Sequence, residues 1–82
     1  MKEVYTANAI FPDNTIVVIV ANIGDNVSLN ISILERGFYK ASKQYNKIVS
    51  ERIFNINTLK QIIDDEVNTL RNTDLYKITY NF

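Results

Sequence analysis

The sequence predicts an α+β fold, in which a small twisted antiparallel sheet of about four to six strands carries one amphipathic helix on one face. An unbroken apolar, β-branched run at 15–21 and an alternating apolar–polar segment at 27–33 are typical of strands. Between about 58 and 71, apolar residues recur at three- and four-residue steps, which is the period of a helix. The predicted order is β-β-β, then either two strands or a helix, then α-β, within one compact domain over 1–82.

The first predicted strand covers residues 3–11, whose side chains alternate between two faces. One face carries Tyr5, Ala7, Ala9 and Phe11. The segment 12–14 should then turn the chain, because Pro12 presets φ while Asp13 and Asn14 accept local hydrogen bonds.

A β-hairpin at 15–35 forms the centre of the predicted fold. Its turn is Gly24-Asp25-Asn26, three residues that tolerate the backbone angles of a turn. The first strand is apolar on both faces, so we expect it inside the sheet. The second strand places Ser28, Asn30 and Ser32 on one face, which is either plain solvent-exposed surface or a docking surface.

The segment that follows fits two structures. Glu35-Arg36-Gly37 predicts a second tight turn. Residues 38–54 then fit either two strands joined by a turn at 44–46, or a single helix. Aromatic and β-branched residues, with good helix formers interrupted by serine and asparagine, favour the strands.

The helix and the last strand are the remaining elements. The helical stripe consists of Leu59, Ile62, Ile63, Val67 and Leu70. Asn57 or Thr58 should cap the N-terminus, and Arg71 suits the negative end of the helix dipole. A final strand over 74–82 has an aromatic side, which we expect to meet the helix in the core rather than to form an interface; its aromatic residues are Tyr76, Tyr80 and Phe82.

Composition argues against catalysis and cofactors. The chain has no cysteine and no histidine, which removes thiol nucleophiles, the commonest general base and the commonest transition-metal ligand. The acidic run Asp64-Asp65-Glu66 is interpreted as a solvated helix face, because consecutive helical side chains point about 100° apart and cannot converge on one ion. No cofactor, metal site or catalytic residue is predicted.

Composition also bears on location. The absence of cysteine favours a reducing, cytoplasmic compartment. No apolar run approaches the roughly 20 residues of a membrane span, and the first residues lack the apolar core of a signal peptide.

The stretch 36–52 is locally basic and contains interleaved aromatic residues, while the whole chain has zero net charge. The predicted partner-binding residues are Arg36, Lys40, Lys43, Tyr45 and Lys47. They fit an acidic protein partner, a single-stranded nucleic acid or an ordinary exposed segment. The preferred hypothesis is a non-catalytic module that binds a larger protein, with the profile of small inhibitors of bacterial host or defence proteins carried by bacterial viruses, including anti-CRISPR proteins. A nucleic-acid-binding module and a subunit that self-associates through a strand edge are the alternatives.

Overall fold

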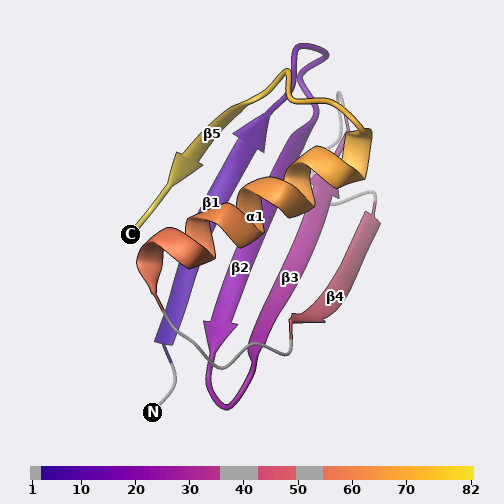
Figure 1. Ribbon diagram of the computed structural model, residues 1–82. Helices are drawn as coiled ribbons and strands as arrows, with labels where there is room; N and C mark the ends of the chain where they lie inside the picture. The colour runs from indigo at the N-terminus through magenta and orange to yellow at the C-terminus, as the bar shows by residue number, and fades with distance from the viewer. Residues whose placement is uncertain (1–2, 36–42, 50–54) are drawn as a thin grey trace.

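A computed structural model describes residues 3–35, 43–49 and 55–82, and in this part of the chain it confirms the α+β prediction (Figure 1). The strands are β1 (Glu3–Ile10), β2 (Ile16–Ile23), β3 (Val27–Leu34), β4 (Lys43–Val49) and β5 (Lys77–Tyr80). They form one antiparallel sheet in the order β4-β3-β2-β1-β5. The helix α1 (Ile56–Arg71) lies diagonally across β1, β2 and β3 on a single face.

The central hairpin forms as predicted. β2 and β3 pair from Ile16 opposite Leu34 to Ile23 opposite Val27, and the backbone N–H of Gly24 donates to the carbonyl of Asn26 at 3.1 Å. β2 is the third of the five strands, which confirms that the strand apolar on both faces lies inside the sheet.

The structure describes part of the ambiguous segment 38–54, namely the strand β4. Residues 43–49 form a strand, as favoured, but the predicted turn at 44–46 is wrong. Tyr45 sits in the middle of β4, opposite Ile31 of β3, and packs against the core. Burial of one aromatic ring and pairing along β3 outweigh the weak turn preference of an asparagine. The predicted turn at 35–37, the strand ends at 38–42 and 50–54, and with them Arg36 and Lys40, lie outside the described residues.

The helical stripe faces the sheet, as its period predicts. Leu59, Ile63 and Val67 are buried, and Ile62 and Leu70 pack against the same core. The helix begins earlier than predicted.

The N-terminal cap of α1 is Asn55, so the predicted caps Asn57 and Thr58 are wrong. Asn55 has an extended backbone, and its side-chain oxygen accepts a hydrogen bond from the N–H of Asn57 at 2.8 Å. The first residue of the helix is Ile56, whose side chain is exposed. Because Ile56 does not belong to the buried stripe, the apolar period does not mark the start of the helix.

The last strand is shorter than predicted, but its aromatic side does meet the helix. The hydroxyl of Tyr80 donates to the carbonyl of Lys60 at 3.1 Å, and that of Tyr76 donates to the side chain of Asp64. Phe82 packs edge-on against Tyr5, with ring centroids 5.1 Å apart. These hydrogen bonds and ring contacts join β5 to α1 and to the start of β1.

The turn between β1 and β2 holds the C-terminal end of the helix. Arg71 donates from Nη1 to the buried hydroxyl of Thr15 at 3.0 Å and from Nη2 to Asp13 at 2.6 Å. Its guanidinium also lies 5.1 Å from the ring centroid of Phe11. The backbone N–H of Thr15 donates to Oδ1 of Asp13 at 3.1 Å. This hydrogen bond, together with the one from Arg71, holds the pKa of Asp13 below its ordinary value of 3.8.

This depressed pKa predicts a specific acid sensitivity. A carboxylate with a lowered folded-state pKa stabilises the fold above its unfolded-state pKa, and that contribution is lost as the pH falls below about 3.8. We therefore expect the gap in unfolding free energy between the wild type and Asp13→Asn to shrink from about pH 5 to about pH 2. Urea unfolding across this range measures the gap, and a constant gap would refute the role assigned to Asp13.

Candidate functional site

Among the described residues, no helix or strand covers the sheet face opposite α1. It consists of the even-numbered side chains of β1 to β4 and the odd-numbered side chains of β5, and we call it the open face. None of these side chains is buried, whereas the odd-numbered side chains of β2 and β3 up to Ile31 are all buried under the helix. The two-residue period of the strands thus divides the sheet into a packed face and an open face.

The strand register arranges the open face in rows that run across the sheet. From β5 to β4, one row contains Thr79, Asn8, Val18, Ser32 and Gln44. The next row contains Thr6, Val20, Asn30 and Asn46. Both rows place valine on the central strand and amide or hydroxyl groups on the flanking strands. The open face is therefore apolar at its centre and able to form hydrogen bonds on both sides of it.

The open face is almost free of charge. Lys77, on the edge strand β5, is its one charged residue. Three of the five large exposed apolar side chains of the described chain also lie on it, namely Val4, Ile10 and Ile48. An exposed sheet face normally carries charged side chains of both signs for solubility. A sheet face with exposed apolar side chains and almost no charge is instead typical of a surface that contacts another macromolecule.

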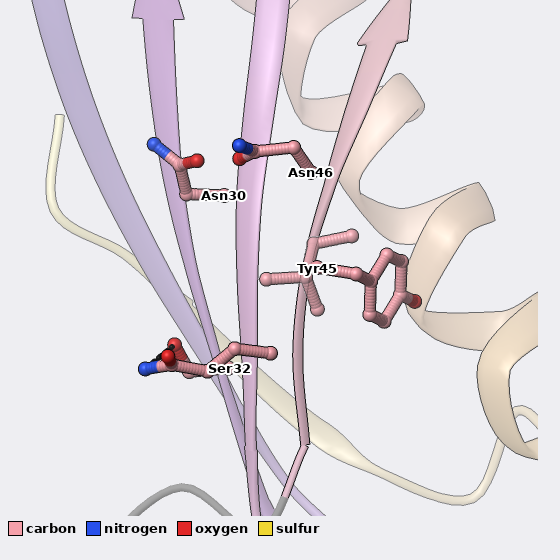
Figure 2. A pocket seen from close by; sticks show the side chains of 6 residues that line it. Asn30, Ser32, Tyr45 and Asn46 are labelled. Carbon is pink, nitrogen blue, oxygen red and sulfur yellow. Dashed lines mark hydrogen bonds between the residues drawn. The ribbon is translucent and has the colours of Figure 1, made fainter.

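Two shallow depressions lie on this face. One, of about 350 Å³, lies between β3 and β4, where Asn30, Ser32 and Asn46 project away from the helix while the Tyr45 ring turns toward it (Figure 2). The amide nitrogen of Gln44 lies 3.5 Å from the hydroxyl oxygen of Ser32 in the same place. The second, of about 510 Å³, shares Asn30 and Asn46 and continues to the turn between β2 and β3. Both are lined largely by uncharged polar groups.

The predicted binding residues that the structure describes lie on the other side of β4. Lys43, Tyr45 and Lys47 have odd numbers and project toward the helix side of the sheet. Lys47 forms a 2.7 Å ion pair with Glu66, and this hydrogen bond raises the pKa of Lys47. The ammonium group of Lys43 lies 6.0 Å from the ring centroid of Tyr45, whose pKa is raised by burial. Lys47 and Tyr45 therefore already serve the packing of β4 against α1, and the binding prediction for this stretch stays a prediction.

The acidic run on α1 diverges, as helical geometry requires. Asp64 accepts from Tyr76, Asp65 from Gln61 at 2.9 Å, and Glu66 from Lys47. Of the three, only Asp65 is exposed, so the interpretation as a solvated face fits that residue but not its two half-buried neighbours. Among the described residues, no group of three acidic side chains is placed to hold a metal ion.

Part of the open face was visible in the sequence. The alternation in 27–33 indicates Ser28, Asn30 and Ser32, but it does not show that the even-numbered positions of β1, β2 and β4 lie beside them. The missed pattern is that these positions also lack charge.

No helix in the described part of the chain is long and apolar enough to cross a membrane. Comparisons with protein-family models, with curated proteins and with solved structures found no match for this chain. The candidate site is therefore defined by geometry and chemistry alone.

Proposed function

We propose that this chain is a non-catalytic protein-binding module that places the open face of its sheet against the surface of a larger protein. The observation that carries the proposal is a five-stranded face with valines on its central strand, amides and hydroxyls on the flanking strands, and one charge at its edge. The core of a protein interface is likewise depleted of charge and surrounded by hydrogen-bonding groups.

The same surface is poorly suited to nucleic acid. Phosphate contacts require lysine or arginine, and on the open face only Lys77 is available. On the helix side of β4, Lys47 is already neutralised by Glu66. The absence of histidine and cysteine from the whole sequence, together with the shallow shape of the two depressions, supports a role in binding rather than catalysis.

The biological setting that we propose is the bacterial cytoplasm. There the module would occupy a functional surface of a host or defence protein, as small inhibitors carried by bacterial viruses do, anti-CRISPR proteins among them. The small size and the cysteine-free composition support this setting.

A capture experiment with two matched variants tests the binding face. Asn30 lies on β3 of the open face, opposite Val20 of the central strand, and Asn68 is exposed on α1, on the opposite side of the molecule. We expect the wild type and Asn68→Lys to capture the same protein from a bacterial lysate, and Asn30→Lys to lose at least about 90% of it, because an unpaired charge in an interface core costs several kcal/mol. Circular dichroism and thermal unfolding check that both variants fold.

Capture that is equal for Asn30→Lys and the wild type would refute the assignment of the open face. Labelled single- and double-stranded nucleic acids provide the second comparison. Strong binding that weakens steeply as salt rises would favour the nucleic-acid alternative, because phosphate contacts release counterions.

A further inference from the structure

The open face is chemically suited to pair with itself. We propose that, when no partner is bound, two copies of this chain stack their open faces in a symmetric dimer. This inference rests on the proposed function, because it takes the open face as the binding surface. Partner binding would then have to displace the second copy.

The strand order supports a twofold arrangement. β2 is the middle strand of the five. A twofold axis that lies between the two open faces, parallel to the sheets and level with their centres, therefore stacks β2 of one copy on β2 of the other. Val18 and Val20, the apolar residues at the centre of the two rows, would then meet the same residues of the second copy. Two sheets pack face to face at a separation of about 10 Å, which such side chains can fill.

Charge and hydrogen bonding favour a like partner as well. In a symmetric dimer the same surface comes from both copies, so a face that carried charges of one sign would repel itself. The rows contain amide and hydroxyl groups, each of which both donates and accepts a hydrogen bond, so identical groups can pair. Lys77 lies on an edge strand and would stay at the rim in contact with water.

The area of the face sets the expected strength. Five strands about 4.8 Å apart, with about seven residues rising about 3.3 Å each, give a face of about 500 Å² per copy. The pair would bury about 1,000 Å², which is at the lower limit for a specific interface. We therefore expect a weak, reversible dimer.

Sedimentation velocity from about 5 to about 500 μM tests the inference. The wild type should shift from monomer to dimer within this range, and Asn68→Lys should follow it. Asn30→Lys should weaken association at least tenfold, because each copy brings a like charge into the interface beside Val20 of the middle strand. About 1 M salt should restore part of the association of Asn30→Lys, because it shortens the screening length to about 3 Å.

Two outcomes would overturn the inference. A wild type that stays monomeric at about 500 μM shows that the face does not pair. A dimer that is unaffected by Asn30→Lys shows that another surface is used, such as a strand edge. The two proposals can fail separately. A monomeric protein whose capture of a host protein depends on Asn30 would support the binding face and refute the dimer. A dimer that captures no host protein would support the pairing of copies and refute the proposed function.

Discussion

Ile63→Ala should lower the free energy of unfolding by about 2–5 kcal/mol, because it removes buried methyl groups and leaves a cavity. Ile63 is 0% exposed and lies in the middle of the stripe that α1 presents to the sheet. A domain of this length is stabilised by only about 4–12 kcal/mol in total. The variant should therefore lose a large share of its stability, which urea unfolding monitored by circular dichroism measures.

The matched control is the same substitution in the same helix. Ile56 is 42% exposed at the first position of α1, so Ile56→Ala should cost less than about 1 kcal/mol. Equal costs at the two positions would mean that the stripe does not pack on the sheet. The fold and the identity of the open face would then both be wrong.

Ala7→Leu should cost about 1–3 kcal/mol by overpacking the core. Ala7 is 1% exposed, and its cross-strand neighbours are Ile19 on β2 and Tyr80 on β5. The small side chains of Ala7, Ala9 and Ala21 all lie in the buried cluster on the helix side of β1 and β2. A leucine at Ala7 has to displace these neighbours or lift the helix.

Asn8→Leu tests the other face of the same strand. Asn8 is adjacent to Ala7 in sequence but belongs to the open face, so leucine there meets solvent and should change stability by less than about 0.5 kcal/mol. Both variants should be unfolded at low micromolar concentration, so that pairing of copies does not contribute. If Asn8→Leu proved as costly as Ala7→Leu, the sheet would be covered on both faces.

The parts of the fold that could be predicted are those encoded by local periodicity. Leu59, Ile63 and Val67 recur at helical spacing, and the segment 27–33 alternates, so each shows its buried face without knowledge of the rest. The errors fall where local preference is weak. The turn expected at 44–46 is a strand because β3 and the core hold Tyr45, and the helix is capped at Asn55 rather than at Asn57 or Thr58 because an exposed isoleucine begins it.

The candidate site was only partly predictable. The alternation in 27–33 predicts a polar surface that either meets solvent or docks a partner, and in the structure this surface is one strand of the open face. The binding stretch predicted from its charge includes Lys47, which is used inside the molecule in an ion pair with Glu66, 19 residues away. Charge composition alone does not reveal such a pair, since it depends on how β4 and α1 lie together.

The sequence by itself determined the α+β class, the central hairpin and the apolar face of the helix, because burial imposes a period on each element separately. Only the tertiary structure decided which surface stays uncovered. The strand register aligns Thr6, Asn8, Asn30 and Asn46 into uncharged rows, and these residues come from three strands. No periodicity within one strand specifies its neighbours, since strand pairing is set by the packing of the whole sheet under the helix.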